Sequence, residues 1–453
     1  MEIETLKRSH LKRNILIAVV VVLIISALIL QFTRARYRVT ESIPLVNGVI
    51  NYTPYDFKIM AMYQQNESGE YEKITTMPSS GYMINETESY CTVDGESKDS
   101  NARLYTNGNG EHVISGLQEK SKCYLYFDEA TANSTILAGK DIQERTDFST
   151  PLTIDTYDTI YKEDTSEGPT YYFAGNTNVN WLYFAGFYWR IVRVNEDGSI
   201  RIIYNGTNMN VPEDGVGSRS FGGETNITSV MYMYGSNSSS ASYESVTENI
   251  NDSPVKEGVD EWYEENLLDT EYEQYISTEA GFCGDRSSYI RSGSSGNYTY
   301  TPGGGTNNTE LTYFGAATRL SPDNAAEIKP TFDCPNENDL YTVASSSKGN
   351  KALTYPIGLI SADEIAYAGG VYGEENEAYY LYSNYTYWTM TPLSYRSYLP
   401  NVYLANTFSG YGSESLGSTT TDWQREIRPV INLRSDITLA GDGTTNNPFT
   451  VVG

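Results

Sequence analysis

Histidine, the side chain most often used for acid–base and metal chemistry near neutral pH, is almost absent from this chain of 453 residues. The only two are His10 and His112. A Ser-His-Asp or Cys-His nucleophile and a histidine-ligated zinc or iron site are therefore excluded from everything after residue 112. We predict no catalytic residue, no metal ligand and no cofactor, and any acid–base chemistry would fall to carboxylates, Lys or Tyr.

The four cysteines, Cys91, Cys123, Cys283 and Cys334, fall into two widely separated pairs. An even count in an exported chain favours disulfides. Because each pair lies within one compositional block, we predict the bonds Cys91–Cys123 and Cys283–Cys334. Free thiols remain an alternative in bacteria that leave exported cysteines unpaired. A four-thiolate metal site would need a C-x-x-C spacing, which the chain lacks.

Tyrosine is abundant, with 40 copies. Aromatic rings stack on sugars and anchor protein interfaces at low entropic cost. The dense run near residues 379–398 predicts a ligand-binding surface, and the alternative is that these rings are ordinary core and rim residues. The predicted contact residues are Tyr380, Tyr382, Tyr385, Tyr387, Trp388, Tyr395 and Tyr398.

Two predicted domains, joined by a linker, must position these side chains. Residues 37–129 alternate with the period of strands and predict a small all-β sandwich. Residues 130–169 are richer in Asp, Glu and Thr and are predicted to be a linker. Residues 170–453 hold all five tryptophans and predict one larger domain with its own core.

Local signals within the larger block are clear. Asp197-Gly198 between two β-branched runs predicts a hairpin, because Gly tolerates positive φ. Ser253-Pro254 opens a helix whose polar face, including Lys256, is predicted to be solvated. The segment Ser361-Ala362-Asp363-Glu364 is a capping box for a second helix that ends at Gly369.

The N-terminal region contains an apolar run with nothing more polar than Ser26 between Ile15 and Leu30. We predict a basic cytoplasmic tail at residues 1–14 and an uncleaved transmembrane signal anchor at Ile15–Phe32 that inserts in the lipid bilayer. A cleaved signal peptide is the alternative. The expected location is the cell membrane, single-pass, with the N-terminus cytoplasmic and the bulk of the chain extracellular.

The formal net charge is −27. Residues 1–38 carry seven Lys/Arg and two Asp/Glu, so the remainder has 24 basic and 56 acidic residues and a net charge of −32. Such a surface repels phosphate backbones, which argues against nucleic acid as a partner.

Several segments together resemble uncharacterised cell-surface proteins of gut Firmicutes and Mollicutes, whose C-terminal module is a domain of unknown function. The same segments distantly resemble the formylglycine-generating-enzyme and C-type-lectin-like fold. The resemblance covers residues 171–453 and rests on residues 188–194, Trp262-Tyr263, Cys283-Gly284-Asp285-Arg286, residues 315–320, 360–364, 388–392 and 428–433.

The resemblance implies an α+β fold class, with a lectin-like α+β domain at residues 170–453 following the transmembrane helix and the small all-β sandwich. The enzymatic relatives use a pair of reactive cysteines late in the domain, whereas no cysteine follows Cys334 here. The expected function is therefore adhesion or recognition of an extracellular glycan or protein ligand, without catalysis. A carboxylate-dependent polysaccharide hydrolase and a structural envelope component are the alternatives.

Overall fold

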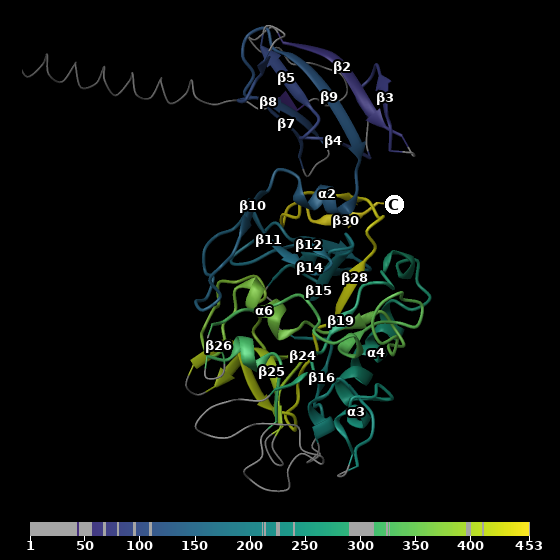
Figure 1. Ribbon diagram of the computed structural model, residues 1–453, viewed down its shortest axis with the longest axis vertical. Coiled ribbons are helices and arrows are strands. Elements are labelled where there is room, and N and C mark those ends of the chain that lie inside the picture. The colour runs from purple at the N-terminus through teal and green to yellow at the C-terminus, as the bar shows by residue number, and fades with distance from the viewer. Residues whose placement is uncertain are drawn as a thin grey trace, which may run out of the picture.

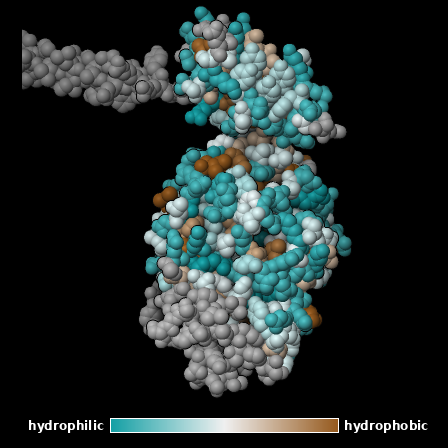
Figure 2. Space-filling model, viewed as in Figure 1, coloured by the Kyte–Doolittle hydropathy of each residue, from teal (hydrophilic) through white to brown (hydrophobic). Residues whose placement is uncertain are grey.

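The computed structural model describes residues 43–44, 57–66, 69–78, 81–93, 97–107, 111–210, 212, 214–222, 227–238, 241–289, 312–322, 325, 327–395, 400–409 and 412–452. Figure 1 shows a smaller β unit at one end and a larger, sheet-rich unit that contains the remaining elements. The face seen in Figure 2 is largely hydrophilic on both units, with small separate apolar patches.

The smaller unit packs two sheets on a shared apolar core. Strand β9 at its centre alternates buried and part-buried residues, as a strand with one core-facing side should. The core includes Ile84, Leu104 and Ile114, which come from both sheets. One sheet has the order β3 (Tyr71–Ile74), β2 (Lys58–Gln65), β9 (Lys122–Glu129), β5 (Tyr90–Val93), β6 (Ser97–Lys98), with β4 (Tyr82–Ile84) also on β9; the other is β1 (Ile43–Pro44), β8 (His112–Ser115), β7 (Arg103–Thr106).

A ten-stranded sheet forms the upper part of the larger unit (Figure 1). The predicted Asp-Gly hairpin is present at its centre, where Gly198 has a φ of 80° and the Asn195 N–H donates to the Ser199 carbonyl at 2.8 Å. The order is β10 (Asp141–Glu144), β11 (Thr159–Thr165), β12 (Gly168–Tyr172), β14 (Phe187–Val194), β13 (Trp181–Phe184), β30 (Phe449–Val451), β29 (Leu439–Ala440), with β15 (Ile200–Gly206) between β14 and β28 (Val430–Leu433), and β23 (Ile357–Gly358) on β28.

A seven-stranded sheet lies farther from the small unit. It is built around β24, whose nine residues are all buried. Its strands are β16 (Ser218–Arg219), β27 (Arg425–Glu426), β24 (Tyr387–Tyr395), β21 (Thr312–Phe314), β20 (Ser288–Tyr289), β25 (Asn401–Ser409) and β26 (Gly412–Thr420), and two-stranded pairs are β17 (Met233–Tyr234) with β18 (Asn251–Asp252) and β19 (Phe282–Cys283) with β22 (Leu340–Tyr341).

The described helices are short. Both predicted caps are present: Ser253 accepts from the Lys256 N–H, and Ser361 forms a capping box with Glu364, after which the helix ends at Gly369 with a φ of 115°. The helices are α2 (Ala132–Leu137), α3 (Tyr243–Val246), α4 (Pro254–Asn266), α5 (Ala317–Leu320) and α6 (Ala362–Ala368), with 3-10 turns at η1 (Ile227–Val230), η2 (Glu273–Tyr275) and η3 (Glu337–Asp339).

The predicted α+β fold class is wrong. The described chain is mostly β-sheet, and its longest described helix, α4, has 13 residues. Residues predicted to be a linker form β10 and β11, which are strands of the ten-stranded sheet. Strand β26, which is rich in Ser, Gly and Thr, forms because its backbone groups find hydrogen-bond partners in the neighbouring strand β25.

The prediction of a single-pass membrane protein is also corrected. Among the residues described, no helix has the length and apolar character needed to cross a bilayer. The predicted anchor at Ile15–Phe32 lies outside the described residues. The predicted cell-membrane location therefore has no support in the structure, and we do not retain it.

Candidate functional site

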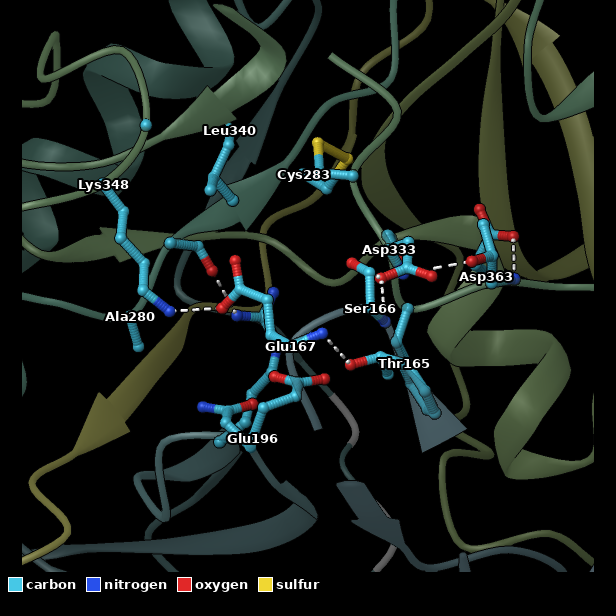
Figure 3. A pocket seen from close by; sticks show the side chains of 18 of the residues that line it. Thr165, Ser166, Glu167, Glu196, Ala280, Cys283, Asp333, Leu340, Lys348 and Asp363 are labelled. Atoms are coloured by element: carbon cyan, nitrogen blue, oxygen red, sulfur yellow. Dashed lines mark hydrogen bonds and ion pairs between the residues drawn. A yellow bond between two sulfur atoms is a disulfide. The ribbon is translucent and has the colours of Figure 1, made fainter. Parts of the chain in front are cut away.

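A cavity of about 410 Å³ opens in the larger unit between segments that are far apart in the sequence. Its wall is formed by the β11–β12 turn, the end of the β14–β15 hairpin, the segment 279–285 and the start of α6. Figure 3 shows Lys348 with Glu167 on one side of the cavity and Ser166 with Asp333 on the other. Its size is in the range of small-molecule sites.

One buried ion-pair network lies at the base of α6. Arg201 of β15 pairs with Glu364, and its Nη2 donates to Glu364 Oε2 at 3.2 Å. Arg193 Nε lies 3.5 Å from Glu364 Oε1, and its Nη1 donates to Glu196 at 3.0 Å. Burial lowers the pKa of Arg201, and the Glu364 carboxylate opposes that effect. Two arginines and two carboxylates thus balance each other in this part of the wall.

A second network is centred on Arg319 of α5. Its Nε and Nη2 donate to Asp363 at 2.7 Å each, a bidentate pair. Nη2 also lies 2.6 Å from Asp285 Oδ2. Burial lowers the pKa of Arg319, but the two carboxylates outweigh burial and raise it. One guanidinium therefore serves two carboxylates, which leaves this network with one negative charge in excess.

Asp285 is the least satisfied group of the wall. The residue is 2% exposed and follows β19 with a positive φ of 37°. Both carboxylate oxygens are closed off from solvent and accept no regular hydrogen bond among the described residues, and their charge is met by the ion pair with Arg319. Both oxygens also lie against the backbone of Gly315, where an added Cβ would be 2.7 and 2.8 Å from them, so the protein itself encloses this carboxylate.

The predicted disulfides are confirmed. Cys283–Cys334 joins β19 to the segment before η3, and both cysteines line the cavity. Phe332, two residues before Cys334, stacks on Tyr367 with ring centroids 3.8 Å apart and lies under the Arg193 guanidinium. Cys91–Cys123 lies in the small unit between β5 and β9.

The cavity lining is acidic. Nine carboxylates face four cationic side chains, an excess of five negative charges. Near the mouth, Glu279 accepts from the Ser347 N–H at 2.9 Å and from its hydroxyl at 2.7 Å, and these hydrogen bonds lower the pKa of Glu279. The carboxylates are Glu167, Glu196, Asp197, Glu279, Asp285, Asp333, Glu337, Asp363 and Glu364, and the cations are Arg193, Arg201, Arg319 and Lys348.

The predicted aromatic contact residues lie elsewhere. Tyr380, Tyr385, Tyr387, Trp388 and Tyr395 are buried in the large core. Tyr382 is half-buried, and Tyr398 lies outside the described residues. Rings enclosed in a core cannot stack on an external ligand, so the five buried side chains do not form the expected surface.

Arg190 and Arg428 lie in the segments 188–194 and 428–433, and neither forms an ion pair with a carboxylate among the described residues. Both instead meet neutral groups: Arg428 donates to the carbonyls of Tyr204 and Leu381 at 2.6 and 3.1 Å. Arg190 donates to Asn180 at 2.7 Å and lies over the Trp181 ring. Asp285 pairs with Arg319.

The residues that do line the cavity stand in segments noted in the sequence. Cys283-Gly284-Asp285-Arg286 and the capping box at Ser361 were recognised as motifs, but their carboxylates were not predicted as a site. The sequence feature that could have indicated this site is the position of Asp285, Asp363 and Glu364 beside short apolar runs. In the part of the chain that the structure describes, no cluster of three His, Cys, Asp or Glu side chains is suited to hold a metal ion.

No family of known proteins, no curated protein and no solved structure matches this chain. The resemblance to lectin-like surface proteins stays a prediction.

Proposed function

We propose that this chain is a binding protein whose larger unit recognises a small polar ligand in the cavity, without transforming it. The observation that best supports this proposal is the pair of preformed ion-pair networks in the cavity wall, centred on Glu364 and Arg319. Side chains fixed by such contacts hold their positions before a ligand arrives, which lowers the ordering cost of binding. A volume of about 410 Å³ suits a monosaccharide, an amino acid or the end of a glycan or peptide.

The hydrolase alternative is less well supported. A glycosidase needs one carboxylic acid that keeps its proton near neutral pH. Asp333 accepts from the Ser166 N–H, and Asp363 accepts from Arg319 and from the Thr331 N–H at 3.0 Å. Both carboxylates are therefore held by groups of the protein, which suits a fixed recognition surface better than proton donation to a substrate.

Disulfides persist in oxidising environments, so the two disulfides favour the proposal that the protein acts in such a compartment. A purely structural envelope component would need no enclosed polar cavity, so the cavity favours recognition over that role.

The test is ligand screening with the full chain. A panel of monosaccharides, amino acids, small amines and cell-wall fragments would be read by thermal shift and then by calorimetry. Ala280 lines the cavity and is half-buried, so Ala280→Trp should fill the space and abolish binding. Ile250 is 71% exposed and does not line the cavity, which makes Ile250→Trp the matched control.

Binding that Ala280→Trp removes and Ile250→Trp preserves would support the proposal. The absence of any binding across the panel, or binding that Ala280→Trp leaves intact, would contradict it. Turnover of a cell-wall fragment would favour the hydrolase instead.

A further inference from the structure

The outer face of the six-stranded sheet in the small unit carries tyrosines and lysines that take no part in the cavity. We propose that this face is a second binding surface, for an acidic glycan whose sugar rings lie on the tyrosines and whose carboxylates pair with the lysines. The surface is separate from the cavity, so it does not depend on the binding function proposed above.

The central strand β9 shows which side chains belong to this face. Leu125 and Phe127 are fully buried in the core of the small unit, whereas Lys122, Tyr124 and Tyr126 alternate with them and are only half-buried. Successive side chains of a strand point to opposite faces of the sheet. The lysine and the two tyrosines are therefore on the outer face.

Tyrosine rings from four strands form a platform on the outer face. Tyr63 of β2 stacks on Tyr126 with ring centroids 4.7 Å apart, and Tyr71 of β3 meets the same ring edge-on at 5.1 Å. Tyr90 of β5 stacks on Tyr124 at 4.9 Å. Rings that pack on one another hold their positions, so they offer a large contact area at low entropic cost. Tyrosine hydroxyls can also exchange hydrogen bonds with the hydroxyls of a sugar.

A row of lysines crosses the sheet beside this platform. Lys58 of β2 is directly opposite Lys122. Thr92 of β5 follows on the other side of Lys122, and Lys98 of β6 is opposite Thr92. Lys98 Nζ lies 4.8 Å from the centre of the Tyr90 ring, so the row adjoins the platform. With strands about 4.8 Å apart, the row extends over roughly 14 Å.

The lysine row calls for an anionic partner. The chain has 58 Asp and Glu against 31 Lys and Arg, yet Lys58, Lys98 and Lys122 form no ion pair among the described residues. Like charges directly opposite each other destabilise a sheet. Lysine can protect an edge strand from pairing with another chain, but Lys122 is on β9, between β2 and β5. A ligand with negative charges would compensate the row.

The surface fits a glycan better than a peptide or a nucleic acid. A peptide that binds through its backbone adds to the edge of a sheet, whereas this platform is centred on β9, which is paired on both sides. A nucleic acid carries a charge on every phosphate and would be repelled by a chain with a net charge of −27. A glycan with carboxylates on some of its sugars brings fewer charges together with many hydroxyls.

The two ends of the face differ, which gives the ligand a direction. At the end away from Lys122, the Tyr71 hydroxyl donates to Asp128 of β9, so the protein supplies its own carboxylate there. A second carboxylate would be repelled at that position. The acidic sugar therefore belongs at the lysine row, with neutral sugars extending over the tyrosines toward Asp128.

Calorimetry on the full chain tests the proposal with matched ligands. Trigalacturonic acid, a mannuronic acid trisaccharide and a hyaluronan tetrasaccharide are each compared with their methyl esters, which keep the sugar rings and remove only the charge. We expect at least one acid to bind about tenfold more tightly than its ester, as a charge-assisted hydrogen bond provides. Its affinity should fall between about 0.05 and 0.5 M NaCl, because salt screens surface charges.

Three variants locate the contact. Lys122→Gln and Lys58→Gln should each weaken binding of the acid about tenfold. Neither should lower the melting temperature, because each removes a repulsive pair, and this distinguishes ligand contact from a structural role. Tyr63→Ser should also weaken binding. Lys329→Gln is the control, since Lys329 is exposed on the larger unit and does not line the cavity.

The outcomes separate this surface from the cavity. Ala280→Trp should leave binding of the acid unchanged, and its loss in that variant would place the ligand in the cavity and overturn the inference. No binding of any of the acids, equal binding of acid and ester, or equal effects of Lys122→Gln and Lys329→Gln would also overturn it. Tighter binding of hexaglutamate than of every glycan would indicate an acidic protein partner instead.

Discussion

Arg319 shows how one side chain organises distant parts of this chain. It comes from α5, pairs with Asp363 at the start of α6 and also contacts Asp285 after β19. Its side chain is 15% exposed, and the two carboxylates are nearly enclosed. Removal of the guanidinium would leave two buried carboxylates with reduced compensation.

We therefore predict that Arg319→Met lowers the free energy of unfolding by about 3 to 5 kcal/mol. Methionine keeps much of the length of the side chain but supplies no charge. Chemical denaturation of the full chain measures the change. Lys162→Met is the control, because Lys162 pairs with Asp164 on the exposed surface and should matter much less. Equal effects of the two variants would contradict the assigned role of Arg319.

His112 predicts a pH dependence of stability. It is buried in β8, and its Nδ1 lies 2.8 Å from the Thr106 hydroxyl, which already accepts from the Ile84 N–H. Burial lowers the pKa of His112, against a smaller opposing effect of a hydrogen bond with the Pro78 backbone.

A lowered pKa of a base means that the unfolded chain binds the proton more readily. Stability from His112 is thus complete above the unfolded pKa of about 6.5 and is lost as the pH falls toward the folded value. We expect thermal unfolding of the small unit to shift to lower temperature between pH 7.5 and pH 5. His112→Gln should reduce that pH-dependent shift, and an unchanged shift would exclude His112 as its source.

At the residue scale the sequence was informative where chemistry is local. The Asp197-Gly198 turn depends on adjacent residues, and the cysteine pairing could be predicted because each pair lies within one compositional block. Lys256 was predicted on a solvated face, yet it is fully buried beside Asp252 and Asp260. The cavity carboxylates were missed because their partners come from other segments, and no single sequence records which arginine meets which carboxylate.

At the scale of elements, the start of α6 connects helix capping with the cavity. Glu364 accepts from the Ser361 N–H at 2.9 Å and also pairs with Arg201. The same carboxylate therefore caps the N-terminus of α6 and balances the charge of a buried arginine. The helix cap could be predicted from four consecutive residues. The ion pair with Arg201 could not, because this arginine is on β15, far away in the sequence.

The disulfide Cys283–Cys334 gives a prediction at this scale. It closes a loop with a sequence separation of 51, for which chain entropy gives about 4 kcal/mol of stabilisation. We expect Cys283→Ala combined with Cys334→Ala to lower stability by up to that amount, measured by denaturation. The double substitution should also weaken ligand binding, because Cys283 and Cys334 both line the cavity.

Cys91→Ala combined with Cys123→Ala is the matched control. This bond lies in the small unit, so its removal should lower the stability of that unit and leave ligand affinity unchanged. An equal loss of affinity in both double variants would show that the effect is not specific to the disulfide of the cavity wall.

The α+β fold class failed for reasons visible in single strands. All nine residues of β24 are buried, so its polar side chains Thr389, Thr391 and Ser394 lie inside the protein, and the strand contains Pro392. Strand β26 is mostly Gly, Ser and Thr, a composition typical of loops. Both strands form because β25 lies between them and supplies hydrogen-bond partners, and tertiary pairing of this kind overrides local propensity.

At the scale of the whole molecule, charge is the dominant property. The net charge is −27, and the visible surface is largely hydrophilic (Figure 2). Repulsion among like charges disfavours the compact state and is screened by salt. We predict that the melting temperature rises by a few degrees between low ionic strength and about 1 M NaCl, where the Debye length is about 3 Å.

Glucose at matched osmolality is the control for that measurement, because it changes solvent activity without adding ions. A fall in melting temperature with NaCl would mean that attractive ion pairs, such as those of Arg201 and Arg319, outweigh surface repulsion.

The connection between the two units is short, and a backbone hydrogen bond joins it to each of them. The Ala130 N–H donates to the Gly81 carbonyl of the small unit at 2.8 Å, and the Ala132 N–H donates to the Ile437 carbonyl of the larger unit at 3.0 Å. Strand β9 leads directly into this connection and pairs in parallel with β2. A tensile force applied to a ligand held by the larger unit would be transmitted directly to β9. The force would act along the strand, so that β9 is sheared against β2. Many hydrogen bonds between the two strands would then have to break at the same time.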